Sequence, residues 1–204
     1  DYNFLKCDRI NVKAKLKSIA ELCIDKGLDD SDIQVLAPMY KGENGIDNLN
    51  IILQELFNPR DDRKEEVRIG EVIYRVGDKV LQLVNDPDNN IFNGDIGYIS
   101  NISTVMSPKK KEVFTIDFDG NEVVYAREDL INIKHAYAIT IHKSQGSEFQ
   151  HVIMPVSKNY YKMLYNKLIY TGVSRAKKSL IIIGEEESFV MATNNDYSTN
   201  RKTD

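Results

Sequence analysis

The chain has 204 residues, of which 42% are hydrophobic and 28% are charged, and its formal net charge is −4. This composition is typical of a globular protein that can bury one large core or two small ones. No apolar run approaches the ~20 residues that span a membrane, so no membrane-spanning helix is expected. The acidic balance excludes a protein that coats nucleic acid through its overall field, but not one that grips a few nucleotides in a groove.

The beginning of the chain and its cysteines give two further indications. The sequence begins at Asp1 without an initiator Met or a signal peptide, so we expect a piece of a longer polypeptide. Cys7 and Cys23 lie in apolar settings without metal-ligand spacing, which favours buried, reduced thiols over a disulfide or a metal site. Reduced thiols indicate a cytoplasmic protein.

Two parts of the chain, at its beginning and its end, alternate between strand and helix patterns. The expected elements are strands at residues 2–7, 33–37, 136–141, 151–156 and 180–183, and helices at 12–26, 46–57, about 162–177 and 185–192. This alternation predicts an α/β fold with a parallel sheet.

The pattern changes between these two parts. Residues 59–66 form a charged connector, and only short strands and turns are expected over 71–133, with hairpin turns at Asn93–Gly94 and Asp119–Gly120. The expected strands lie at residues 78–84, 97–100, 112–118 and 122–125. A small antiparallel β-barrel at 72–133 is therefore predicted within an α/β domain made of 1–71 and 134–204.

The most informative stretch is residues 138–149, with the sequence A-I-T-I-H-K-S-Q-G-S-E-F. A strand ends here, and ligands of open α/β sheets bind beyond the carboxyl ends of strands. Thr140 and His142 are expected to point to one side, where they suit a phosphate or a base. Gly146 permits close approach to a ligand, and Glu148 can accept from ribose hydroxyls. The alternative is a polar loop whose hydroxyls cap the next helix, with Glu148 in a capping box.

Two cations outside that stretch are candidates for phosphate contacts. Arg175 lies in Y-T-G-V-S-R-A-K-K, and its planar fork suits phosphate oxygens; alternatively it is a helix C-terminal cation like its neighbours Lys177 and Lys178. Lys41 lies in V-L-A-P-M-Y-K-G, where a solvated loop lysine is the alternative. Lysines 109–111 form a charge run in an expected hairpin loop, and contact with DNA or a solvated tip both remain open.

Together these motifs resemble motifs IV, V and VI of superfamily 1 DNA helicases, most closely the RecD-like branch that includes the exodeoxyribonuclease V α-subunit. The RecD-like motif V run H-K-S-Q-G-S-E-F is matched at every position of 142–149. The resemblance implies a second RecA-like domain, interrupted by an SH3-like barrel with V-G-D-K-V at 76–80 and I-F-N-G-D-I-G at 91–97.

The resemblance also implies residue roles and cofactors. Single-stranded DNA would be contacted by Thr140, His142, Lys143 and Ser144. ATP would be contacted by Lys41, Gly146, Glu148 and Arg175, the last as an arginine finger at the γ-phosphate. The sequence contains no G-x-x-x-x-G-K-[ST] phosphate loop. The phosphate loop and the Mg²⁺ ligands are therefore expected on an N-terminal RecA-like domain of the same protein, and this chain alone is expected to be inactive.

The implied function is that of an ATP-dependent 5′–3′ DNA helicase. Its implied partners are single-stranded DNA, duplex junctions and possible nuclease subunits. Two alternatives stay open at this point. One is the helicase half of a conjugative relaxase, and the other is a non-catalytic module that keeps the fold and binds DNA or a protein.

Overall fold

The computed structural model describes residues 1–156, 166–187 and 190, and it divides into two compact units. The first four residues of the helix expected at 162–177, and most of the end of the helix expected at 185–192, lie outside the described residues. Within the described part, no helix is long and apolar enough to cross a membrane.

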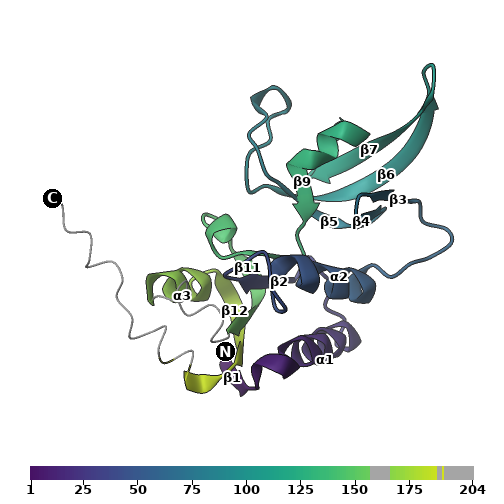
Figure 1. Ribbon diagram of the computed structural model, residues 1–204. Coiled ribbons are helices and arrows are strands. Elements are labelled where there is room, and N and C mark those ends of the chain that lie inside the picture. The colour runs from purple at the N-terminus through teal and green to yellow at the C-terminus, as the bar shows by residue number, and fades with distance from the viewer. Residues whose placement is uncertain (157–165, 188–189, 191–204) are drawn as a thin grey trace. The chain divides into compact units, whose positions relative to one another are not determined.

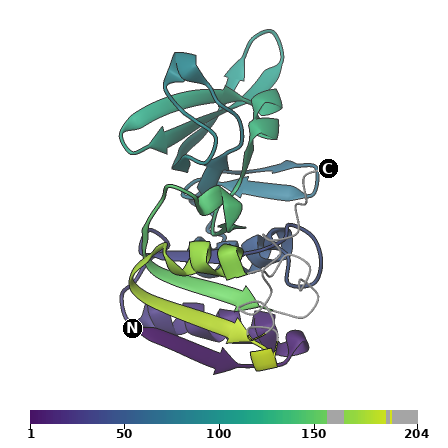
Figure 2. The ribbon, with the colours of Figure 1, turned by 90° about the vertical axis from the view of Figure 1, so that its left-hand side faces the viewer.

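The first unit, Asp1–Leu56 with Ala138–Asp204, contains a five-stranded parallel sheet in the order β1-β12-β11-β2-β10. Figure 2 shows β1, β11 and β12 running in the same direction. The strands are β1 (Tyr2–Lys6), β2 (Ile33–Ala37), β10 (Ala138–Thr140), β11 (Phe149–Val156) and β12 (Ala176–Gly184).

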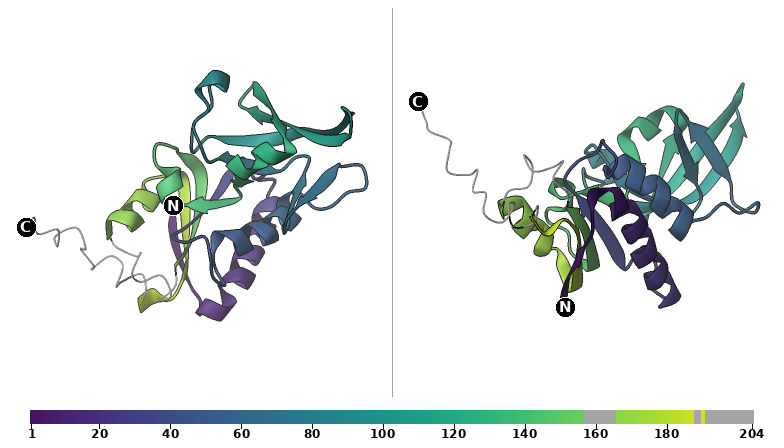
Figure 3. Two further views of the ribbon diagram at one scale, coloured as in Figure 1. Left: turned by 45° about the horizontal axis from the view of Figure 1, so that its top comes forward. Right: turned by 60° about the horizontal axis from the view of Figure 1, so that its bottom comes forward.

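Helices cover both faces of this sheet. Helices α1 (Val12–Asp25) and α2 (Ile46–Phe57) lie on one face, and α3 (Asn166–Val173) lies on the other (Figures 1 and 3). Because β2 is covered from both sides, all five of its residues are buried, including Gln34. Parallel strands require crossover connections, which the helices provide. The predicted α/β parallel-sheet class is confirmed.

The second unit, Phe57–Tyr137, is built on an antiparallel sheet in the order β8-β7-β6-β5-β9. Its strands are β5 (Lys79–Gln82), β6 (Ile96–Met106), β7 (Lys110–Phe118), β8 (Asn121–Ala126) and β9 (Ile133–His135). They enclose a core that includes Val80, Ile99 and Phe114. The predicted turn at Asp119 and Gly120 joins β7 to β8, and both residues have positive φ, 53° and 89°.

A hairpin of β3 (Glu66–Ile69) and β4 (Val72–Arg75) precedes this sheet, although a charged connector was expected at 59–66 and no strand between it and 78–84. Val67 and Ile69 pack against the core of the unit, whereas Glu66 and Arg68 alternate with them. The charges obscure a period-two pattern that is present. The four described 3-10 helices are η1 (Arg9–Asn11), η2 (Pro87–Asn89), η3 (Arg127–Asn132) and η4 (His142–Ser144).

A buried carboxylate ties the two ends of the second unit together. Asp78 is fully buried and accepts hydrogen bonds from Asn58 Nδ2 at 2.8 Å and the Tyr137 hydroxyl at 2.9 Å. It also accepts from the Arg75 backbone N–H at 2.7 Å, and it lies 2.9 Å from His135 Nε2. The compact unit therefore begins before, and ends after, the predicted range 72–133, because residues on both sides of that range converge on Asp78.

The pKa of Asp78 results from opposing effects. Desolvation by burial raises it, while the hydrogen bond and charge of His135, with the hydrogen bonds from Asn58 and Arg75, lower it by a larger amount. The net pKa lies below the ordinary value of an aspartate, so the carboxylate is held ionised in the interior.

The cysteines differ in part from the expectation. Neither Cys7 nor Cys23 forms a disulfide, but each is half-buried rather than buried. Burial nevertheless raises the pKa of both thiols.

Candidate nucleotide and DNA site

Two candidate segments follow neighbouring strands at one edge of the parallel sheet, the edge formed by the carboxyl ends of its strands. Strand β10 pairs in parallel with β2, and Thr140 lies opposite Ala37 at the last pair. The turns after these strands therefore leave the sheet at the same edge, and they carry the exposed side chains of Lys41 and His142. The structure thus brings the Lys41 segment toward the His142 end of residues 138–149.

The hydroxyls of the 138–149 stretch are used within the turn itself. Thr140 is 7% exposed, and its Oγ1 accepts a hydrogen bond from the Lys143 N–H at 3.1 Å. Ser144 is fully buried, and its Oγ donates to the Ile141 carbonyl at 2.6 Å. These bonds stabilise the 3-10 turn η4, as in the capping alternative. Ser144 therefore has no side-chain atom available to DNA, contrary to expectation, while His142 is exposed and Lys143 half-buried.

After η4 the chain returns along the sheet to its opposite edge, which is formed by the amino ends of the strands. Gly146 has φ +83° and open space where a Cβ would lie, so the turn needs its backbone freedom. Phe149 begins β11 beside Ala176, and His151 lies opposite the first residue of β2. Thr140 and Phe149 are thus on the order of 20 Å apart along the strand direction, at ~3.3 Å per residue. One short segment reaches both edges of the sheet.

Arg175 lies at this second edge, between α3 and β12. Its carbonyl accepts from the Phe149 N–H at 2.8 Å. Its guanidinium donates from Nη1 to the Ser147 carbonyl at 3.1 Å and from Nε to the Thr171 carbonyl at 3.3 Å. Arg175 is therefore half-buried, because two backbone carbonyls hold its guanidinium.

The charge of Arg175 is not neutralised by an acid in the described part of the chain. Its partners there are carbonyls and the Ser174 hydroxyl, and no carboxylate lies within ion-pair distance. The nearby acid of residues 138–149, Glu148, instead pairs with Lys177 at 3.0 Å. Both of those side chains are more than half exposed, so this pair contributes little to stability. Lys177 was predicted only as a solvated cation.

Gly172 lets α3 approach the strand beneath it. A Cβ at this position would lie 2.7 Å from Met154 Cε and 3.7 Å from Ile141 Cγ2. The helix that ends next to Arg175 therefore packs closely against β11 and against Ile141, the residue just before η4. Residues 138–149 and the Arg175 segment are in contact through both backbone and side chains.

Lys41 is not brought to Arg175. The loop that carries it folds back on the first turn of α2, where the Ile46 N–H donates to the Met39 carbonyl at 3.0 Å. A Cβ on Gly45 would lie 2.5 Å from the Lys41 backbone carbon, so the loop can close only over glycine. This fold keeps Lys41 at the β2 end of the sheet, the edge opposite Arg175.

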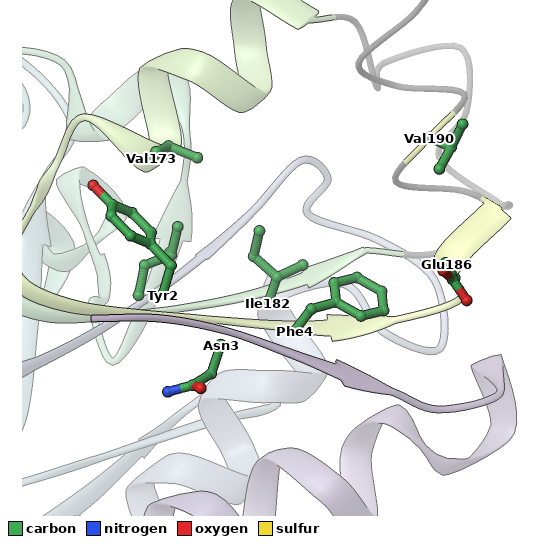
Figure 4. A pocket seen from close by; sticks show the side chains of 8 residues that line it. Tyr2, Asn3, Phe4, Val173, Ile182, Glu186 and Val190 are labelled. Atoms are coloured by element: carbon green, nitrogen blue, oxygen red, sulfur yellow. The ribbon is translucent and has the colours of Figure 1, made fainter.

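An apolar hollow of about 570 Å³ lies elsewhere, on the α3 face of β1 and β12. Figure 4 shows Tyr2, Phe4 and Ile182 pointing to this side of the strands, with Asn3 pointing away. Its only charged lining residue in the described part is Glu186. A hollow without a cation does not suit a phosphate ligand, and it includes none of the predicted site residues.

The described residues contain no group of three or more His, Cys, Asp or Glu side chains that could hold a metal ion. The same residues do offer a guanidinium and an exposed glycine turn, which fit a phosphate-bearing ligand. The carbonyls that hold the guanidinium, from Ser147 and Thr171, were missed because backbone groups leave no signal in the sequence.

Two family models match the chain. Residues 49–118 match the SH3 domain of ATP-dependent RecD-like DNA helicases, and residues 135–183 match the UvrD-like helicase C-terminal domain. The ATP-dependent RecD2 DNA helicase of Deinococcus radiodurans is 38% identical over 160 residues, covering 78% of this chain and 21% of that protein. The RecBCD enzyme subunit RecD of Buchnera aphidicola subsp. Schizaphis graminum is 30% identical, covering 77% and 25%.

A solved structure of Bacteroides Pif1 bound to single-stranded DNA is 20% identical with a TM-score of 0.48, covering 81% of this chain and 43% of that one. A likeness at this level adds nothing to the assignment. The parallel sheet with helices, the antiparallel unit and the two matched models define a helicase domain that carries an SH3 domain. The chain belongs to the RecD-like DNA helicases. It spans about a fifth to a quarter of the length of these two relatives.

Proposed function

We propose that this chain is the second RecA-like domain, with its inserted barrel, of an ATP-dependent helicase that moves 5′ to 3′ on single-stranded DNA. One observation carries the proposal: residues 138–149 reach both edges of the sheet. They include the exposed His142 at one edge, and they end at Ser147 and Phe149, which are hydrogen-bonded to Arg175 at the other edge. A segment that touches both ligand sites can pass a change at one to the other.

The nucleotide side of the proposal rests on Arg175. Its fork is oriented by the Ser147 and Thr171 carbonyls, which leave the positive charge uncompensated by any acid in the described part of the chain. A fixed, unneutralised guanidinium suits the negative charge that develops on a γ-phosphate. Gly146 and Glu148 lie in the same segment and would border the nucleotide. A separate N-terminal domain would supply the phosphate loop and the Mg²⁺ ligands.

The DNA side of the proposal rests on the edge formed by β2 and β10. His142 offers an exposed imidazole for a base or phosphate, and Lys143 adds a cation. Thr140 and Ser144 would act by holding the turn. We place Lys41 on this side rather than at the nucleotide, because its loop leaves the sheet next to Thr140 and opposite Arg175. We further propose that the unit Phe57–Tyr137 acts as a distinct domain that borders the DNA path.

The test is reconstitution of the complete polypeptide. DNA-stimulated ATP hydrolysis is measured for this chain alone, for the N-terminal part alone and for the two joined. We expect turnover only from the joined protein, with 5′–3′ unwinding of a tailed duplex. Turnover by the isolated chain, or DNA binding without hydrolysis by the joined protein, would contradict the proposal. Covalent attachment of the natural protein to a DNA strand would instead identify a relaxase-linked enzyme, and co-purifying nuclease subunits would identify a complex of the RecBCD kind.

A further inference from the structure

A two-stranded ribbon extends from the second unit. Strand β8 pairs with β7 only from Val113 to Phe118, whereas β6 and β7 remain paired as far as Met106 and Lys110. Figure 1 shows β6 and β7 running on together to their turn. Residues 103–111, which form the end of this ribbon, are exposed at every position. None of these residues belongs to the core of the unit, so packing does not determine which side chains occur there.

The end of the ribbon is strongly basic in an acidic protein. Lysines 109–111 are consecutive, and no acidic residue occurs anywhere over 96–111, although the whole chain has a net charge of −4. The next acid, Glu112, is paired with Arg127 at 3.3 Å. None of the three lysines forms an ion pair with another described residue. Three adjacent positive charges are therefore left uncompensated at the tip.

Apolar side chains accompany these charges on both faces of the ribbon. Met106 lies opposite Lys110, and Val105 lies opposite Lys111. Residues opposite each other in an antiparallel pair share a face, and successive residues alternate, so each face carries one lysine beside one apolar side chain. Met106 is 71% exposed and Val105 is 44% exposed. A lysine beside an apolar side chain suits a ligand whose phosphates lie next to the apolar walls of a groove.

We propose that the tip of the β6–β7 ribbon binds double-stranded DNA, with lysines 109–111 on the phosphates and Met106 and Val105 against the sugars of one groove. A two-stranded ribbon fits the major groove, which is about 12 Å wide. Single-stranded DNA is gripped mainly by stacking on aromatic rings, and residues 103–112 contain none. The proposal rests on the proposed function only in taking DNA as the substrate, and it adds the duplex as a second ligand of this chain.

The test measures binding of the 204-residue chain to a fluorescent 25-base-pair duplex by anisotropy, between 50 and 200 mM NaCl. The test variant replaces Lys109, Lys110 and Lys111 by Gln. The control replaces three exposed lysines of and after α1, Lys15, Lys17 and Lys26, by Gln, so the net charge changes equally. We expect the test variant to lose at least tenfold in affinity at 50 mM NaCl, and the control at most twofold.

The salt dependence sharpens the result. Each lost phosphate contact should reduce the slope of log K against log salt by ~0.9, so the test variant should lose roughly two to three units of slope. Replacing the same three lysines by Arg should retain the binding. Equal losses in test and control variants, an unchanged slope, or no measurable duplex binding by the unaltered chain would each overturn the proposal. An acidic protein as the true partner would appear as an unchanged DNA affinity in the test variant.

This measurement is independent of the helicase assignment. It needs neither ATP nor the N-terminal domain, and it does not use His142 or Arg175. Loss of DNA-stimulated hydrolysis in the complete polypeptide with duplex binding intact would refute only the proposed function. Intact hydrolysis, with a duplex affinity that does not change when lysines 109–111 are replaced, would refute only the proposal that the ribbon binds duplex DNA.

Discussion

The interior of the second unit and the candidate site of the parallel-sheet unit use polar side chains in opposite ways. Around Asp78 the polar groups are buried and paired: Asn58, Tyr137 and the Arg75 N–H donate to its carboxylate, His135 lies beside it, and the buried Arg75 is paired with Glu66 at 2.9 Å. In the parallel-sheet unit, His142, Lys41 and Glu148 are exposed, and Arg175 is held only by carbonyls and a hydroxyl. Saturated buried groups specify a fold, whereas uncompensated charges are available to a ligand.

The contrast makes a general point about charged residues in this chain. A charge whose partner lies within the same unit should cost stability when removed. A charge without a carboxylate partner should cost binding or catalysis and little stability. The predictions on Arg175, Asp78 and His142 test that division, and one on two glycines stands among them; all run from the largest expected effect to the smallest.

Arg175→Ala in the complete polypeptide should lower the rate of ATP hydrolysis by about a thousandfold or more, the usual contribution of an arginine finger. Stability should fall by only about 1–2 kcal/mol, since the lost hydrogen bonds to Ser147 and Thr171 involve partly exposed groups. Arg175→Lys should restore part of the rate, because a point charge lacks the fork. Steady-state kinetics and thermal unfolding measure the two effects. Lys178→Ala is the control, and normal turnover with a large drop in Tm would place Arg175 among the structural charges.

Asp78→Ala should destabilise the second unit by about 3 kcal/mol, because His135, Asn58 and Tyr137 would lose a buried acceptor. Urea unfolding at pH 7 gives the free energy, and the exposed Asp88→Ala serves as the control. A loss equal to that of the control would show that the cluster contributes nothing to the fold.

The same residue predicts a pH dependence. Because folding lowers the pKa of Asp78, its contribution to stability is fully present above the ordinary carboxyl pKa of ~3.9. It is lost as the pH falls through the lower, folded pKa. Asp78→Asn should therefore show a smaller loss of unfolding free energy between pH 7 and pH 3 than the unaltered chain. An identical acid limb in Asp78→Asn and the unaltered chain would contradict the assignment.

Gly97→Ala should destabilise the protein by about 1–3 kcal/mol, because its Cβ would lie 2.9 Å from the Asp117 backbone oxygen, which cannot easily move. Gly146→Ala meets no atom within 4 Å and should cost only about 1 kcal/mol, from its positive φ. Differential scanning calorimetry gives the Tm of both variants. It compares a glycine required by close packing with one required by its positive φ. The reverse order of the two Tm values would show that φ strain outweighs crowding here.

His142→Ala should weaken binding of single-stranded DNA by about 1 kcal/mol, or roughly fivefold, and leave Tm unchanged because the side chain is exposed. Ser144→Ala provides the opposite case: it removes the bond to Ile141 and should lower Tm. Oligonucleotide anisotropy and thermal melts on the same samples separate the two. If His142→Ala lowers Tm and leaves DNA affinity intact, His142 belongs to the structural group.

Much of the fold could be predicted from local pattern. The strand at 33–37 and the helix at 46–57 were placed correctly, because a run of buried residues and a helical stripe each have a clear period. The β3–β4 hairpin was missed since charged residues alternate with Val67 and Ile69 and hide the pattern. The strands β6 and β7 were predicted too short, because their outer parts are exposed and carry no hydrophobic alternation.

The site was predictable to a smaller extent. The motif residues of 138–149 and Arg175 were found by their resemblance to a helicase family, which identifies residue types but not their environments. Whether Thr140 points to solvent or caps a turn depends on the path of the next four residues. Whether Lys41 lies near Arg175 depends on strand order, which no local pattern encodes.

The sequence by itself determined the class of fold, the helicase family and the identity of the candidate residues, because periodicity and motif spacing are local properties. Only the tertiary structure decided which candidates lie together. The parallel pairing of β10 with β2 places Lys41 and His142 at one edge, and that of β11 with β12 places Ser147 beside Arg175 at the other. These neighbours are far apart in the chain, and the pairing of the strands brings them together. That pairing is made by backbone hydrogen bonds, which form with almost any side chain and therefore leave little trace in the sequence.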